Sequence, residues 1–248
     1  MRPYTICHMM ASLDGRIDCD MTEQIDDTNH YYEALENLNC PSTLESKTTL
    51  KMHYALPGFY DNRCEYKAAG KQVYKAENAK GYAVGLDTAG TLLWDDHTKE
   101  LFGKPLIMIL SEWASQDYLD YLKERGISYI TIGDESPVEY DEITGAGVSS
   151  GPYIDLVGAM EILRGEFGIE RLAVVGGGHV NGSMLDLGLL DGISMMYGHG
   201  IDGREGMAAA FDGRPKNRKP VRLQFKSVKE QDGIVWMRYL VNNEIKKE

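Results

Sequence analysis

Residues 171–191 read RLAVVGGGHVNGSMLDLGLLD and decide the fold. An apolar run, residues 172–175, has the length of a buried strand and meets three consecutive glycines, and the residues that follow predict a helix ending near Gly188. A helix N-terminus presents unpaired N–H groups and a partial positive charge, and glycine lets a bound group come close to the backbone. The stretch therefore predicts a strand–glycine–helix unit, with an anion or a cofactor phosphate as one explanation of its glycines.

Close packing of the strand against the helix is a second explanation of the glycines. The run is not a G-x-G-x-x-G dinucleotide fingerprint, because counting from Gly176 places Asn181 where the third glycine belongs. It also lacks the Lys-Ser/Thr ending of a P-loop. The glycines alone leave both explanations open, whereas Gly182 lies inside the expected helix and is predicted to be a packing residue.

Around this unit the chain alternates between expected strands and helices. Strands are expected at 4–11, 81–87, 104–110, 127–133, 171–175 and 192–198, and helices at 26–40, 115–126, 155–167 and 179–188. In the first helix Tyr32, Leu35 and Leu38 are expected to share a face, with Asp27 or Thr28 as the cap. Residues 40–80 show no sustained period.

The alternation of strand and helix implies parallel strands covered by helices. Residues 221–241 predict an antiparallel hairpin at a sheet edge, with its turn at Asp232-Gly233. We therefore predict an α/β fold: a single three-layer domain over residues 1–248, with a mostly parallel central sheet and a C-terminal antiparallel hairpin.

Composition excludes several classes of partner. The chain has 248 residues and a net charge of −12, so it would repel nucleic acid and anionic membranes. It has no run of 18 apolar residues and no signal-peptide pattern, so no membrane-spanning helix is expected. Its four cysteines lack metal-site or C-x-x-C spacing and are expected to be free thiols in the cytoplasm. The six histidines form no metal-ligand cluster, so no metal is predicted, and the buried-strand residue His8 is expected to be a satisfied core histidine.

Four ordered stretches carry a resemblance to a known family: RPYTICHMMASLDGRID at the N-terminus, GYAVGLDTAGTL in the middle, LAVVGGGHVNGSMLDLGLLDGISMMYGHGIDG, and GIVWMRYLV near the C-terminus. Together they resemble the riboflavin-pathway pyrimidine reductases, which share the dihydrofolate-reductase fold. The matches span residues 2–241. The resemblance implies an NADPH-dependent reductase of a small heterocycle, with 5-amino-6-(5-phosphoribosylamino)uracil as the substrate and riboflavin biosynthesis as its pathway. No catalytic side chain is identified.

The resemblance also implies which residues bind the cofactor. They are Met10, Ala11, Ser46, Lys47, Thr49, Thr88, Gly176, Gly177, Gly178, His179, Val180 and Asn181. Lys47 stands where the family has an arginine, and it either meets a 2′-phosphate as a point charge or is a solvated lysine. Thr88 either reaches the adenosine half of the cofactor or lies in a strand-end turn.

The implied substrate-binding residues are Asp14, His53 and Val175. A turn-stabilising side chain is an equal explanation of Asp14. Val175 departs from the family, whose biosynthetic members usually carry a glutamate there, and an isopropyl group cannot replace the hydrogen bonds of a carboxylate. The basic residues expected to meet the substrate phosphate have no clear register; the candidates are Lys51, His53, Arg63 and Lys67. The family's zinc deaminase signature is absent.

Three hypotheses about function follow. The first is the NADPH-dependent reductase, and the second is an NADPH-binding relative with a diverged substrate or no turnover. The third is a flavin- or S-adenosylmethionine-binding domain, which would leave the ordered terminal matches unexplained. The family also implies a homodimer, for which the hairpin at 221–241 is the candidate surface, because an uncovered edge strand is prone to pairing.

Overall fold

The computed structural model describes residues 1–25, 29–60, 69–133, 139–140, 147–148 and 153–242. The chain forms two compact units. The central unit contains residues 1–2 and 45–169, and the terminal unit contains residues 3–44 and 170–248. Each unit is described by itself below. The prediction of a single domain over 1–248 stays a prediction.

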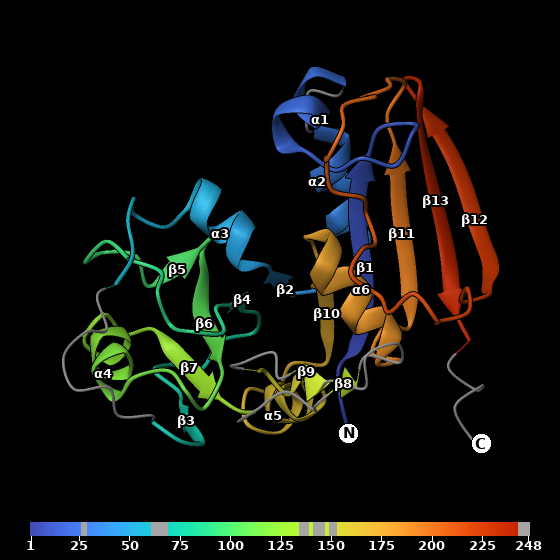
Figure 1. The fold of residues 1–248 in the computed structure, drawn as a ribbon. Coiled ribbons are helices and arrows are strands. Elements are labelled where there is room, and N and C mark those ends of the chain that lie inside the picture. The colour runs from blue at the N-terminus through green and yellow to red at the C-terminus, as the bar shows by residue number, and fades with distance from the viewer. Residues whose placement is uncertain (26–28, 61–68, 134–138, 141–146, 149–152, 243–248) are drawn as a thin grey trace. The chain divides into compact units, whose positions relative to one another are not determined.

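The terminal unit is built on a sheet whose strands run in the order β12, β13, β11, β1, β10, β2. Their bounds are β12 Leu223–Gln231, β13 Ile234–Val241, β11 Gly192–Tyr197, β1 Tyr4–Ala11, β10 Arg171–Val174 and β2 Ser42–Glu45. The last residue of β2, Glu45, is the first residue of the central unit. Strands β11, β1, β10 and β2 are parallel, whereas β13 is antiparallel to both β11 and β12. Figure 1 shows β12, β13, β11 and β1 side by side, with β12 at the edge.

Helix α2 covers one face of this sheet. The helices of the unit are α1 Cys19–Ile25, α2 Asn29–Glu36 and α6 Gly178–Asp186. Ala34 of α2 packs with Met10 and Met196, and Trp236 borders the same cluster. Leu38, just after α2, packs with Ile6 in a neighbouring cluster. Apolar side chains on alternate strand positions therefore anchor α2.

The central unit has its own run of strands, in the order β4, β6, β7, β3, with β5 paired to β6. Their bounds are β4 Ala83–Leu86, β6 Lys104–Leu110, β7 Ser128–Thr131, β3 Gln72–Tyr74 and β5 Glu100–Leu101; β8 Glu139–Tyr140 pairs with β9 Gly147–Val148. The helices are α3 Lys47–His53, α4 Gln116–Glu124 and α5 Leu156–Gly165. Strands β4, β6 and β7 are parallel, and β3 is antiparallel to β7.

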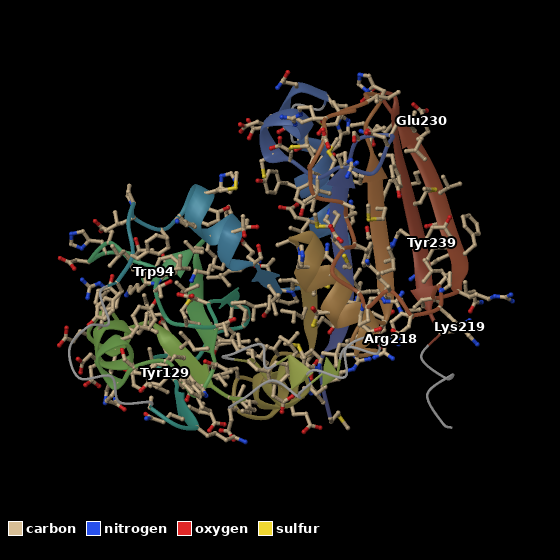
Figure 2. The ribbon with its side chains drawn as sticks, viewed as in Figure 1. Trp94, Tyr129, Arg218, Lys219, Glu230 and Tyr239 are labelled. Carbon is tan, nitrogen blue, oxygen red and sulfur yellow. The ribbon has the colours of Figure 1, made fainter. Side chains whose placement is uncertain are left out.

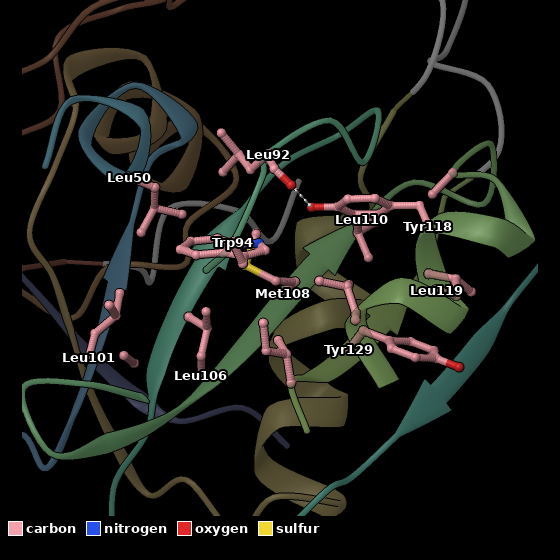
Figure 3. Close-up of a cluster of buried hydrophobic side chains, with 14 residues drawn as sticks. Leu50, Leu92, Trp94, Leu101, Leu106, Met108, Leu110, Tyr118, Leu119 and Tyr129 are labelled. Carbon is pink, nitrogen blue, oxygen red and sulfur yellow. Dashed lines mark hydrogen bonds between the residues drawn. The ribbon is translucent and has the colours of Figure 1, made fainter. Parts of the chain in front are cut away.

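A cluster of buried hydrophobic side chains forms the core of the central unit (Figure 3). Trp94 and Tyr118 are both buried in it, and Met108 and Leu110 of β6 lie in the same cluster. The Tyr118 hydroxyl donates a hydrogen bond to the Leu92 carbonyl oxygen over 2.8 Å, so burial of this phenol leaves its polar end satisfied.

The predicted fold class is confirmed, and several elements match closely. Strand β6 has the predicted bounds. Ser115 and Asp155 cap α4 and α5 through their side chains, as expected. The hairpin turns at Asp232 and Gly233, which have φ values of 52° and 82°. These are the positive values that a two-residue hairpin turn requires.

Three features differ from the sequence-based expectations. Residues 40–80 contain β2, α3 and β3, elements too short to show a period. Helix α1 was not predicted. In α2 the expected face is wrong at Tyr32, which is 50% exposed, because the helix buries Ala34 and is followed by buried Leu38. The proposed caps Asp27 and Thr28 lie outside the described residues.

Candidate functional site

The glycine run connects β10 to α6 in the terminal unit. Gly176 has a φ of 128°, which strongly favours glycine, and the Gly176–Gly177 peptide bond is cis. Gly177 is the N-cap of α6 and supplies no side-chain cap. The first turn of α6 therefore has no side-chain oxygen from its cap residue to satisfy its N–H groups.

Two other glycines are explained by close packing. A Cβ atom at Gly178 would overlap the carbonyl oxygen of Ala209, and one at Gly182 would overlap that of Asp212. The Asp212 N–H also donates a hydrogen bond to the Gly178 carbonyl oxygen over 3.0 Å. Packing of α6 against this segment confirms the prediction for Gly182. Close packing against Ala209 is sufficient to explain the glycine at position 178.

Asn181 is the most constrained side chain of the loop. It is completely buried, and its Nδ2 donates a hydrogen bond to the Ala210 carbonyl oxygen over 2.7 Å. That bond fixes the orientation of the amide. Its Oδ1 has no hydrogen-bond partner in the described part of the chain. His179, by contrast, is exposed, and Val180 is half-buried.

The loop after β1 is held by Asp14. Met10 and Ala11, the last residues of β1, are both buried. The Asp14 carboxylate accepts hydrogen bonds from the Ser12 hydroxyl over 2.6 Å and from the backbone N–H groups of Asp202 and Gly203, each over 3.0 Å. These bonds lower the pKa of Asp14 to about 2, the Ser12 bond contributing most. The turn-stabilising explanation of Asp14 is therefore the one that its contacts support.

His8 is a satisfied core histidine, as predicted. Its Nε2 lies 3.1 Å from the carbonyl oxygen of Tyr31, which can only accept, so Nε2 carries the proton. Its Nδ1 then accepts from the Ser194 hydroxyl over 2.9 Å, and that hydroxyl accepts from Trp236 Nε1 over 2.7 Å. Burial is the main cause that lowers the pKa of His8 from 6.5 to about 4.

In the central unit, Lys47 neutralises a buried carboxylate. Its Nζ lies 2.7 Å from Asp87 Oδ1 and 2.5 Å from the Thr91 hydroxyl. The other carboxylate oxygen of Asp87 accepts from the N–H groups of Thr91 and Leu92 over 2.6 and 2.8 Å. Lys47 is thus paired with Asp87, and its side chain is 37% exposed to solvent.

The remaining predicted residues of this unit have different surroundings. Ser46 caps α3: its hydroxyl accepts from the Thr49 N–H over 3.3 Å and lies 3.1 Å from the Thr49 hydroxyl. Thr88 is half-buried, and its carbonyl oxygen accepts from the Ser111 hydroxyl over 2.8 Å. His53 is exposed at the end of α3.

The basic residues do not gather into a phosphate site within the described residues. Lys51 lies over the Phe59 ring, with Nζ 3.8 Å from its centroid. Arg63 and Lys67 lie outside the described residues. In the basic loop at 214–220, Arg214 and Arg218 form ion pairs with Asp186, at 3.3 and 3.1 Å (Arg218 is labelled in Figure 2). The described residues contain no cluster that could hold a metal ion.

One residue with unusual surroundings was missed. Glu45, at the end of β2, is only 4% exposed, and its Oε2 has no partner among the described residues. The sequence signal was a lone carboxylate directly before the Ser46 helix cap, in a stretch where no period marked the strand.

A mostly parallel sheet, an antiparallel C-terminal hairpin and a glycine loop leading from β10 into α6 define a dihydrofolate-reductase-like α/β protein. The family model "RibD C-terminal domain" matches residues 91–235, more than half of the chain. The chain therefore belongs to the RibD C-terminal domain family. It is an oxidoreductase of the pyrimidine-reductase class.

Solved structures support the fold. A pyrimidine reductase-like protein from Corynebacterium diphtheriae is 15% identical with a TM-score of 0.65, covering 97% of this chain and 92% of that one. The riboflavin biosynthesis reductase Rib7 of Saccharomyces cerevisiae is 15% identical with a TM-score of 0.57, covering 97% and 89%. Acinetobacter baumannii RibD is 15% identical with a TM-score of 0.62, and the match covers 97% of this chain but 58% of RibD. No curated protein matches the chain.

No described helix is both long and apolar enough to cross a membrane.

Proposed function

We propose that the protein uses NADPH to reduce a ribosylaminopyrimidine, with 5-amino-6-(5-phosphoribosylamino)uracil as the substrate. Family membership supports the class of reaction. The observation that carries the cofactor proposal is the orphaned Oδ1 of Asn181, a buried acceptor with no partner in the described part of the chain. Buried polar atoms are nearly always hydrogen-bonded, so this atom fits a ligand that donates to it.

Nicotinamide cofactors offer suitable donors, namely the carboxamide N–H groups and the ribose hydroxyls. In the terminal unit, Asn181 and the N–H groups at Gly178, His179 and Val180 would bind the cofactor, together with the backbone of Gly176, Gly177, Met10 and Ala11. In the central unit, Ser46, Thr49 and Thr88 would contribute hydroxyl groups. Lys47, which forms an ion pair with Asp87, would contribute its ammonium group to cofactor binding.

The reduced nicotinamide supplies the hydride when it is bound. The task of the chain is to orient the two reactants and to exclude water. Asp14, held by Ser12, Gly203 and Asp202, would act by fixing the loop beside the substrate. His53 and Val175 are the other proposed substrate contacts.

One observation favours the alternative of a diverged substrate or no turnover. Val175 packs against the apolar cluster of Ile6, Leu38, Cys40 and Ala173, so its side chain offers the substrate no hydrogen bond. A substrate with fewer polar groups at this position would suit it better.

We further propose that the protein is a cytoplasmic homodimer that pairs through its hairpin. Strand β12 is an edge strand, and its Leu223, Phe225 and Val228 are 40%, 59% and 54% exposed. Phe225 contacts the ring of Tyr239, which Figure 2 labels on the neighbouring strand. Exposed apolar side chains on an open edge favour self-association. Light scattering should give twice the chain mass for the wild type and a monomer for Phe225→Asp.

The cofactor proposal is tested by titrating the protein with NADPH and NADH while following nicotinamide fluorescence. Wild type should bind NADPH, Gly177→Val should abolish binding, and Asn181→Leu should weaken it about tenfold, the value of one hydrogen bond to a buried acceptor. Gly165→Ala, at a glycine whose Cβ position is open, is the matched control and should bind as the wild type does. A wild type that binds neither nucleotide would overturn the proposal.

A further inference from the structure

A short segment, residues 207–212, connects the loop after β1 with helix α6, and we call it the strap. On one side it pairs with the loop as a short antiparallel strand, through a bridge between Arg16 and Ala209. The Ile17 N–H donates a hydrogen bond to the Ala208 carbonyl oxygen over 3.0 Å. The strap, the loop and α6 all belong to the terminal unit, so their contacts are internal to one compact body.

On its other side the strap packs against the start of α6. The Asp212 N–H donates a hydrogen bond to the Gly178 carbonyl oxygen over 3.0 Å, and a Cβ atom at Gly178 would overlap the carbonyl oxygen of Ala209. The Ala210 carbonyl oxygen accepts from Nδ2 of the fully buried Asn181 over 2.7 Å. Because a carbonyl oxygen can only accept, this bond turns Nδ2 of the amide toward the strap and leaves Oδ1 for another partner.

One side chain anchors the strap to the loop. Arg16 Nη1 donates to the Met207 carbonyl oxygen over 2.6 Å, at the beginning of the strap. The backbone of Arg16 is itself held, because its N–H donates to the Ser12 hydroxyl over 3.1 Å and its carbonyl oxygen accepts from the Ser12 N–H over 3.0 Å. Ser12 directly follows Ala11, the last residue of β1. Arg16 therefore ties the strap to the end of a buried strand.

The composition of the strap makes such an anchor necessary. Residues 207–211 read MAAAF, so no side chain among them carries a hydrogen-bond donor, and polar contacts to this part of the strap depend on its backbone. A guanidinium group is always charged, and a hydrogen bond from a charged donor is roughly twice as strong as a neutral one. Arg16 is half-buried, so its charged group keeps part of its hydration while it holds the strap.

We propose that Arg16 is a positioning residue for the cofactor: it holds the strap in place, and the strap holds the Asn181 amide with Oδ1 available to the ligand. This inference rests on the proposed function, in which Asn181 is a cofactor contact, and it assigns no ligand contact to Arg16 itself. Without the guanidinium group the strap would lose its charge-assisted bond, and the amide would adopt other orientations. Apparent affinity falls in proportion to the fraction of molecules in the binding-competent arrangement.

A double-mutant cycle, measured by NADPH titration, tests the proposal. Arg16→Met keeps the aliphatic part of the side chain and should weaken binding about fivefold, whereas Arg16→Lys keeps a charged donor and should restore most of the affinity. In the Asn181→Leu background, Arg16→Met should have no further effect, because the residue through which it acts is gone. Arg222→Met makes the same change at an exposed arginine of the same unit and should bind NADPH as the wild type does. Additive effects in the cycle, or wild-type affinity in Arg16→Met, would overturn the proposal.

Hydrogen exchange tests the coupling without a cofactor. The Asn181 side-chain amide and the Asp212 N–H are both hydrogen-bonded in the contact between the strap and α6, so both should be protected in the wild type. Arg16→Met should speed their exchange at least about threefold and leave exchange in the β12–β13 hairpin unchanged. Unchanged exchange at both positions would overturn the inference. If exchange depends on Arg16 but the wild type binds neither NADPH nor NADH, the proposed function fails and the coupling of Arg16 to Asn181 stands.

Discussion

Lys47 Nζ lies 2.7 Å from Oδ1 of Asp87, a carboxylate with no exposed surface. Lys47 lies in the first turn of α3, and Asp87 directly follows β4. Asp87 also accepts two backbone N–H groups, so a single buried carboxylate organises the loop that follows β4. Lys47 supplies the charge that makes this burial tolerable.

Removing that charge should destabilise the protein. Lys47→Ala would leave the Asp87 carboxylate buried without its counter-ion, and we expect a loss of about 3 kcal/mol in the free energy of unfolding. Urea unfolding at pH 7 measures it. Lys71→Ala, at an exposed lysine, is the control and should stay within about 0.5 kcal/mol of wild type. Equal stability of the two variants would show that the ion pair contributes little.

Gly182→Ala should disrupt the packing of α6. The added methyl group would overlap the Asp212 carbonyl oxygen, so the backbone at Asp212 would have to move. We expect a loss of more than about 2 kcal/mol in the free energy of unfolding. Gly165→Ala adds the same methyl group at a helical position with open space around it, and it should be neutral or stabilise by up to about 1 kcal/mol. Thermal unfolding of the pair, compared with wild type, separates steric overlap from helix propensity.

His8 should make the protein sensitive to acid. Its pKa is lowered from 6.5 to about 4, so between these values the unfolded chain binds a proton that the folded chain does not. Stability is therefore lost as the pH falls through this window, by about 2 kcal/mol between pH 7 and pH 5. His8→Gln removes this contribution, whereas His53→Gln, at an exposed histidine, should keep the wild-type dependence. Urea unfolding at the two pH values measures it, and parallel curves for wild type and His8→Gln would contradict the expectation.

Glu45 should have the opposite pH dependence. Its folded pKa is raised from 4.5 to about 7, so the folded chain keeps a proton that the unfolded chain releases, and stability is lost as the pH rises through this window. Glu45→Gln should therefore raise the free energy of unfolding relative to wild type, and this gain should be about 2 kcal/mol larger at pH 8 than at pH 5. Urea unfolding at both values tests this. Equal gains at the two pH values would contradict the raised pKa of Glu45.

Local chemistry explains which elements were predictable from the sequence. The bounds of β6 follow from a continuous apolar run, and Ser115 and Asp155 cap the helices whose first turns they precede. The hairpin turn at Asp232-Gly233 needs positive φ values that few residue pairs adopt easily. In each case the deciding residues are neighbours in the chain. Residues 40–80 lack such signals, because β2, α3 and β3 have only four, seven and three residues.

In the candidate site, too, the sequence predicted some features and left others to the tertiary structure. The sequence identified the glycine loop and Asn181 as a candidate binding segment, because their order along the chain carries that information. It left open whether the glycines served packing, and the overlap of Gly178 and Gly182 with Ala209 and Asp212 came from the tertiary structure.

By itself, then, the sequence determined the α/β class, the mostly parallel sheet and the terminal hairpin, since periodicity and turn chemistry act over a few residues. Only the tertiary structure decided that Lys47 meets Asp87 and that both ring nitrogens of His8 are hydrogen-bonded. It also decided that Glu45 Oε2 is buried without a hydrogen-bond partner among the described residues. Segments that are distant in the sequence determine the environment of each charged or polar side chain. The free energy of a buried polar group depends on those surroundings and not on the residue type alone.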